Sequence, residues 1–152
     1  MPSVSPSYLY TFIAMLAVGS LLVFSFMAYV NATRFSSETK QLKNLMDYVA
    51  ARSTELVTLA LTTNETAQSC LQMPVTIGSR QYWLQLQNDS ENVWIEGGFG
   101  DTALEGTGLR IYLPKEANAT GYYVGGYGAA YLSCVFSFGV PQLRLENLNE
   151  GS

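Results

Sequence analysis

The side chains best suited to covalent chemistry in this sequence are two cysteines, Cys70 and Cys134. They stand near opposite ends of a segment rich in alternating apolar residues. If this segment lies outside the cytoplasm, the pair predicts a disulfide that joins the first strand to a late one. Two buried free thiols are the alternative.

Four asparagines are candidates for modification, because each begins an N-x-S/T sequon: Asn31, Asn64, Asn88 and Asn118. With eight Asn and 26 Ser and Thr in 152 residues, chance alone gives about one or two such sequons. Four is a mild excess, and three of them fall in turn-like contexts after residue 60. The sequons therefore favour an exterior location with N-glycans attached.

Several other kinds of chemistry are missing. The chain has no histidine, which removes Ser-His-Asp and Cys-His catalysis and the usual zinc sites. The glycines at 125–128 do not fit a phosphate-binding loop, and Asp89, Glu91 and Glu96 are expected to be solvated loop charges. The net charge of −4 argues against a nucleic-acid partner. We expect no enzyme, no cofactor and no bound metal.

Residues 8–30 carry no charged side chain and are predominantly apolar. As a helix they would extend ~34 Å, enough to cross a ~30 Å hydrocarbon core. Tyr8, Tyr10 and Tyr29 stand where interfacial aromatic anchors would. A cleaved signal peptide is the alternative, but the run is long and no basic residue precedes it. One face of this helix is the candidate surface for assembly: Tyr8, Phe12, Leu16, Gly19, Val23, Phe26 and Val30.

The helix is expected to continue beyond the apolar segment, because residues 32–61 contain no Gly or Pro. Five apolar residues there recur at steps of three and four, with Arg52 filling one missing place: Leu42, Leu45, Val49, Leu56 and Leu59. This spacing predicts an amphipathic helix. We assign Leu42, Leu45, Val49 and Leu56 to the same assembly surface, and residues 1–60 to one helical region.

The two indications of membrane orientation disagree. Arg34, Lys40 and Lys43 follow the apolar segment, so the positive-inside rule favours a C-terminal domain in the cytoplasm. The sequons, the cysteine pair and the polar Gly-, Thr- and Asn-rich composition favour the exterior. Acidic Glu38 and Asp47 are interleaved with the basic residues and weaken their signal, so we expect a cell-surface or extracellular location.

Residues 61–152 change to a period of two, which is typical of strands. Seven short segments alternate in this way, with turn signals between them: 73–77, 82–87, 93–95, 109–113, 122–124, 132–140 and 143–145. They predict an all-β sandwich of about seven strands, and an α+β chain overall.

The tyrosine-rich stretch 121–131 is either a contact surface or an ordinary strand–turn–strand.

This layout resembles the type IV pilin superfamily, and most closely its archaeal branch of pilins, archaellins and related membrane-anchored β-sandwich proteins. The resemblance covers the architecture of the whole chain, and Ser5-Pro6 before the apolar helix is its local motif. It implies a non-enzymatic structural subunit of an extracellular filament. The helices of such a subunit leave membrane lipid to pack against copies of themselves.

The sequence departs from the family at its start. Met1 to Ser7 contains no Lys or Arg, whereas pilin precursors carry a basic leader, and the Glu of bacterial-type subunits is absent. This departure favours an alternative function: a single-pass, membrane-anchored binding or scaffold domain, such as a stator-like accessory, that does not polymerise.

Overall fold

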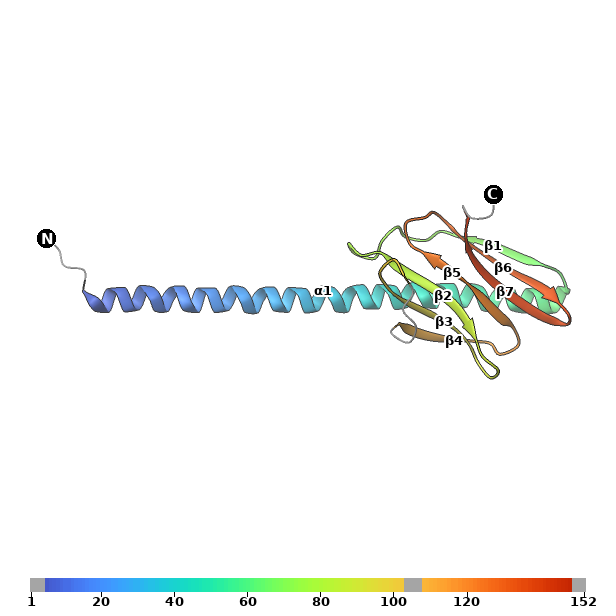
Figure 1. Ribbon diagram of the computed structural model, residues 1–152, viewed down its shortest axis with the longest axis horizontal. Coiled ribbons are helices and arrows are strands. Elements are labelled where there is room, and N and C mark those ends of the chain that lie inside the picture. Colours follow the sequence, from blue (N-terminus) through green and yellow to red (C-terminus); the bar gives the residue numbers. More distant parts are fainter. Residues whose placement is uncertain (1–4, 103–107, 149–152) are drawn as a thin grey trace. The chain divides into compact units, whose positions relative to one another are not determined.

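The computed structural model describes residues 5–102 and 108–148. It contains one α-helix and seven strands, in agreement with the expected α+β class (Figure 1). These elements are α1 (Pro6–Thr63), β1 (Ala67–Leu71), β2 (Tyr82–Asn88), β3 (Val93–Phe99), β4 (Leu109–Leu113), β5 (Asn118–Val124), β6 (Ala130–Ser137) and β7 (Val140–Asn147).

The local sequence explains where helix α1 begins and ends, although its end at Thr63 lies three residues beyond the expected one. Pro6 occupies the first turn, where its missing N–H costs no hydrogen bond, and the Tyr8 N–H donates to the Ser5 carbonyl at 2.9 Å. After Thr63 the backbone turns left-handed at Asn64, with a φ of 54°. The Asn64 N–H donates to the Ala60 carbonyl at 2.8 Å, so this residue closes the C-terminus of the helix.

The chain divides into two compact units, residues 1–38 and residues 39–152. We expected the division at residue 60, where the helix was predicted to end. It falls earlier because the last part of α1, from Thr39 to Thr63, forms one core with the strands. The second unit therefore consists of a helix segment and a sheet.

All seven strands belong to one mixed sheet, in the order β1-β6-β7-β5-β2-β3-β4. The β-sandwich expected from the sequence needs two sheets, so this part of the prediction is wrong. In the second unit the layer facing the sheet is α1. Alternation along a strand shows that one face of the strand is buried, but it does not show whether a helix or another sheet buries it.

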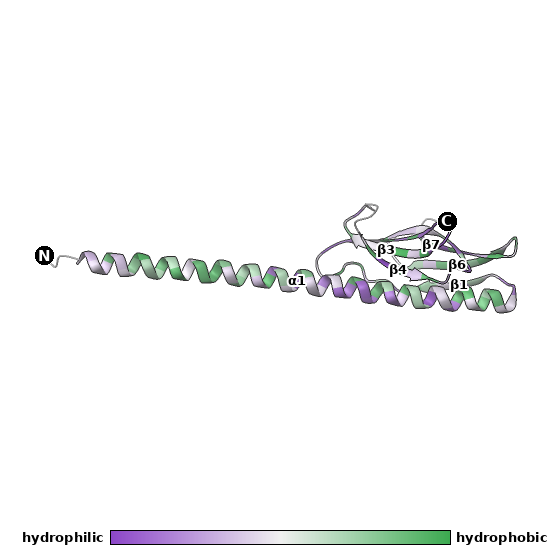
Figure 2. Ribbon diagram, turned by 90° about the horizontal axis from the view of Figure 1, so that it is seen from below, coloured by the Kyte–Doolittle hydropathy of each residue, from purple (hydrophilic) through white to green (hydrophobic). Residues whose placement is uncertain are grey.

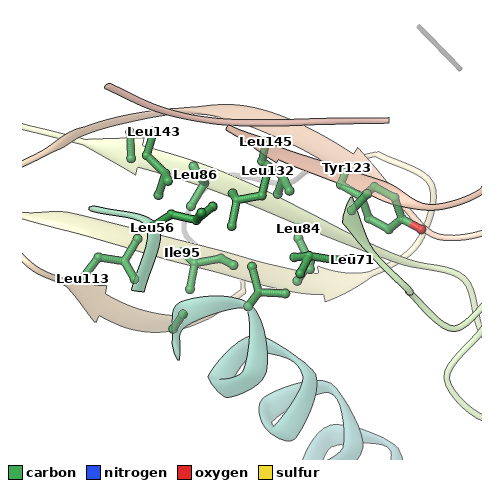
Figure 3. Packing of buried hydrophobic residues seen from close by; sticks show 14 of the residues in the cluster. Leu56, Leu71, Leu84, Leu86, Ile95, Leu113, Tyr123, Leu132, Leu143 and Leu145 are labelled. Atoms are coloured by element: carbon green, nitrogen blue, oxygen red, sulfur yellow. The ribbon is translucent and has the colours of Figure 1, made fainter. Parts of the chain in front are cut away.

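The core lies between α1 and one face of the sheet. Leu56 of the helix packs among side chains such as Leu84, Leu86 and Ile95 of the central strands (Figure 3). The buried residues of the helix recur at helical spacing: Leu42, Met46, Val49, Ala50, Ser53, Leu56, Val57 and Ala60. The buried face differs from the predicted stripe toward the end of the helix. Leu59, which the stripe contains, is 50% exposed, and Arg52 is exposed and pairs with Glu55 at 2.9 Å.

Two strand predictions were wrong. Residues 73–77 do not form a strand, and Ile77 makes only an isolated bridge to Arg80; the first strand is β1, which directly follows the helix. Residues 132–140 are not one strand but belong to a hairpin, in which Ser137 pairs with Val140. Phe138 and Gly139 form its turn, with φ values of 52° and 82°. Positive φ at both residues of a two-residue turn matches the right-handed twist of the flanking strands.

Candidate functional site: the apolar helix, the thiols and the sequons

The apolar segment of α1 is exposed from Tyr8 to Tyr29, and Val30 at its end is half-buried. Its most apolar stretch, within the first unit, has no residue buried, and the predicted assembly residues Tyr8, Phe12, Leu16, Val23 and Phe26 are all exposed. Gly19 has no neighbouring atom within 4 Å of where a Cβ would stand. Figure 2 shows apolar residues predominating here, with a few weakly hydrophilic ones, and strongly hydrophilic residues in the part that follows. The helix is long and apolar enough to cross a membrane.

Two of the polar side chains in this segment bond to the helix itself. The Thr11 hydroxyl donates to the Ser7 carbonyl at 2.9 Å, and the Ser20 hydroxyl donates to the Leu16 carbonyl at 2.7 Å. Bonds of this kind satisfy hydroxyl groups without help from water. The segment therefore presents a surface that suits lipid or another apolar helix.

The second half of the predicted assembly surface is not a surface. Leu42, Val49 and Leu56 are buried against the sheet, and Leu45 packs partly against the same core. Amphipathic periodicity predicts that one helix face is covered, but it does not identify what covers it. Here the chain's own sheet does so, and Leu42, Val49 and Leu56 are unavailable to a second copy, while Leu45 is only partly buried.

The predicted disulfide is absent, because both cysteines are free thiols. In the β1–β6 pair, Cys70 lies opposite Tyr131 and Cys134 lies opposite Ala67. The two cysteines are thus offset by three positions and point to opposite faces of the sheet, since side chains alternate along a strand. Cys70 is exposed, whereas Cys134 is buried in the core, where burial raises the pKa of its thiol.

All four sequon asparagines are exposed. Asn31 lies within α1, and Asn64 is the left-handed residue that follows it. Asn88 ends β2 and Asn118 begins β5, and the Asn88 side-chain amide lies 3.5 Å from the Asn118 side-chain oxygen. Their N-glycosylation stays a prediction, but each of the four side chains has the exposure that a modifying enzyme needs.

One acidic residue contradicts the sequence prediction. Asp89 and Glu91 lie in the exposed turn between β2 and β3, as expected, but Glu96 lies within β3 and is only 1% exposed. The Arg110 guanidinium stands 3.7 Å from its carboxylate, and the Gly108 N–H donates to it at 3.3 Å. A buried carboxylate needs such partners, so Glu96 serves the structure of the sheet rather than solvation.

Within residues 5–102 and 108–148, no three His, Cys, Asp or Glu side chains gather as metal ligands would.

The tyrosine-rich stretch contributes to both core and surface. Tyr123 is buried and its hydroxyl donates to the Gly128 carbonyl at 2.7 Å, while Tyr127 is exposed. The Tyr123 ring lies 6.2 Å from that of buried Tyr82, whose hydroxyl donates to the Pro74 carbonyl. Burial first, and then its tyrosine neighbour, raises the pKa of Tyr82. The strand–turn–strand interpretation therefore accounts for much of this composition.

Comparison with protein-family models, characterised proteins and solved structures finds no match to this chain.

Proposed function

We propose that this protein is a non-enzymatic structural subunit of an extracellular, archaeal-type filament. In this proposal the N-terminal helices form the core of the filament and the β-rich units form its surface. One observation carries it. The apolar part of α1, in the first unit, has no buried residue in its most apolar stretch, whereas in the second unit the helix buries one face against the sheet from Leu42 onward.

An uncovered apolar helix of this length has two suitable environments. Before assembly the segment 8–30 spans the lipid bilayer, whose thickness it matches. After assembly copies of the same segment cover one another, through the face that contains Phe12, Leu16, Gly19 and Val23. Because lipid is as apolar as leucine, close packing rather than the hydrophobic effect would drive this association, and the missing Cβ of Gly19 allows close approach.

The exposed sequons support the exterior location of the β-rich unit. Asn64, Asn88 and Asn118 all belong to this unit, and none has to move to become accessible. A glycan on any of them excludes a cytoplasmic location for the unit, and with it the orientation favoured by Arg34, Lys40 and Lys43.

The second candidate is a membrane-anchored binding or scaffold domain that does not polymerise. The observation in its favour is that the helix has one uncharged stretch, whose length suits a single crossing of the bilayer without any partner. In that case the segment 8–30 stays in lipid permanently.

Fractionation of the native source separates the two functions. Filaments sheared from the cell surface are purified and their subunits identified by mass spectrometry, and the washed membranes are treated in the same way. The filament proposal expects the chain to be a major component of the filaments. Its recovery from membranes alone, as a monomer after mild cross-linking, overturns the filament proposal and supports the membrane-anchored alternative.

A variant pair tests the role of the helix surface. Gly19→Leu adds bulk to the predicted contact face without adding charge, so it leaves membrane insertion intact and lowers filament yield. Ala14→Leu is the control, because it adds similar bulk on the opposite side of the helix. Equal filament yields from both variants would argue against the assigned face.

A further inference from the structure

A shallow groove of about 370 Å³ lies where strands β2 and β5 separate. From Gly121 to Val124, β5 pairs with β2, but from Asn118 to Gly121 it pairs with β7 instead. The backbone changes direction at Gly121, with a φ of 128°. The end of β2 thus loses β5 as a neighbour after Leu86, and the two strands leave an opening between them.

The groove is lined mainly by polar and aromatic side chains. Gln87, Trp94, Arg110 and Thr120 contribute to it from four strands, and Asn88 lies at its rim beside Asn118. In the strand register Gln87 is opposite Trp94, and Glu96 is opposite Arg110. These side chains therefore share the sheet face that points away from α1.

The indole of Trp94 supplies an unused hydrogen-bond donor in this groove. Its Nε1 is buried and has no partner within the part of the chain that the structure describes. A buried indole N–H normally finds an acceptor, so this unused donor is available to a ligand. The Arg110 guanidinium lies 5.2 Å from the ring centroid, and its side chain is 44% exposed.

We infer that this groove binds a saccharide. Sugars combine apolar C–H faces, which suit an aromatic surface, with hydroxyl groups that both donate and accept hydrogen bonds. Gln87, Asn88 and Thr120 offer donors and acceptors, and Trp94 and Arg110 offer further donors. Arg110 is paired with Glu96, so the site is close to neutral and favours an uncharged sugar over a phosphate or nucleotide. An apolar ligand does not fit the polar lining.

The inference does not depend on filament formation, and two sources of the sugar share the same chemistry. The first is a glycan carried by Asn88 or Asn118 at the rim of the groove. The second is a glycan of another molecule. The same spectroscopic measurement, made on unmodified and on native protein, distinguishes them.

The experiment follows the indole N–H resonances of the full-length chain, produced without glycosylation, in micelles of a detergent that lacks a sugar head group. The chain has two tryptophans, Trp83 and Trp94, so two indole signals are expected and Trp94→Phe assigns them. The probes are glucose, galactose, mannose, N-acetylglucosamine and their disaccharides. We expect at least one probe to move the Trp94 signal with a dissociation constant on the order of 1–10 mM, while the Trp83 signal stays in place.

A matched pair of variants tests whether the groove is responsible. Gln87→Ala removes a groove amide and is expected to weaken binding about 2- to 10-fold, the effect of one hydrogen bond. Gln68→Ala makes the same change on the same face in β1, outside the groove, and leaves the affinity unchanged. The inference is overturned if no probe moves the Trp94 signal up to 100 mM while the spectrum stays dispersed, or if both variants bind like the unaltered chain.

The source of the sugar follows from the native, modified protein. If its own glycan fills the groove, the Trp94 signal already stands at the saturated position, added sugar does not move it, and Asn88→Gln or Asn118→Gln restores the response. If the native protein responds like the unmodified one, the groove receives a glycan from another molecule. Either result supports a saccharide site.

Discussion

A Cβ atom placed on Gly121 would overlap the carbonyl oxygen of Leu145, its register partner in the parallel pair of β5 and β7. The same atom would stand 2.6 Å from the Leu145 nitrogen. Both neighbours are backbone atoms, which cannot move aside as a flexible side chain can. This close approach allows β5 to leave β2 and join β7, so the order of the sheet depends on a residue without a side chain.

Gly121→Ala should therefore destabilise the second unit by about 3 kcal/mol or more, from positive-φ strain together with the backbone overlap. Denaturant unfolding of the full chain in micelles, followed by tryptophan fluorescence, measures this because both tryptophans lie in the unit. Gly126→Ala is the control: its φ is also positive, at 96°, but its nearest neighbour is 3.8 Å away. It should cost about 1 kcal/mol. Equal losses of unfolding free energy in the two variants would mean that positive-φ strain alone, without the backbone overlap, explains the effect of Gly121→Ala.

Leu56→Ala and Leu59→Ala compare the same substitution on two faces of α1. Leu56 is 6% exposed and lies in the core, whereas Leu59 is 50% exposed. The first variant should lose about 2–4 kcal/mol of unfolding free energy and the second less than about 1 kcal/mol. Similar losses from both variants in the same unfolding assay would mean that the helix covers the sheet with the stripe expected from the sequence, because that stripe contains both residues.

The two thiols should differ in reactivity. Cys70 is exposed and should react with a maleimide in the folded protein, whereas Cys134 should react only after unfolding, because it is buried and burial keeps it protonated. Mass spectrometry should find one adduct per folded chain and two per unfolded chain, with Cys70→Ser removing the first. A non-reduced chain with no adduct and a mass 2 Da lower, the loss of two hydrogens, would instead show an intramolecular disulfide.

Stability should fall at alkaline pH. Burial raises the pKa of Tyr82, of Tyr123 and of the Cys134 thiol above their ordinary values. Below about pH 7 these groups hold their protons in both states and add no pH dependence; in the unfolded chain the thiol begins to titrate near pH 8 and the tyrosines near pH 9. As the pH rises further, the unfolded chain releases its protons while the native chain retains them, so unfolding becomes more favourable by up to about 1.4 kcal/mol per pH unit for each group. Tyr82→Phe should reduce the slope of unfolding free energy against pH, measured from pH 8 to 11. An unchanged slope would mean that Tyr82 does not contribute to the pH dependence.

The turn at Phe138 should tolerate replacement. Phe138 is fully exposed, at 101%, and has a positive φ that is unfavourable for a bulky residue. Phe138→Asn supplies the residue that such a turn prefers and should raise the unfolding free energy by about 0.5–1 kcal/mol. Phe138→Ala removes the ring without that preference and should leave stability nearly unchanged. A loss of stability in both variants would mean that the ring packs against something.

Much of the architecture was predictable because it depends on local patterns. The uncharged run before Asn31 and the absence of Gly and Pro after it predict one long helix. Alternation places most of the strands near their observed positions. The single sheet was not predictable, because a strand's pattern shows a buried face without identifying the layer that buries it.

The candidate sites divide in the same way. The sequence by itself determined that residues 8–30 are apolar on every side, that four sequons are present and that histidine chemistry is absent. Only the tertiary structure decided that Cys70 and Cys134 point to opposite faces, that Glu96 is buried, and that Asn88 and Asn118 meet beside Trp94. The physical reason is strand register: pairing between strands far apart in the chain determines which side chains become neighbours, and no local pattern encodes it.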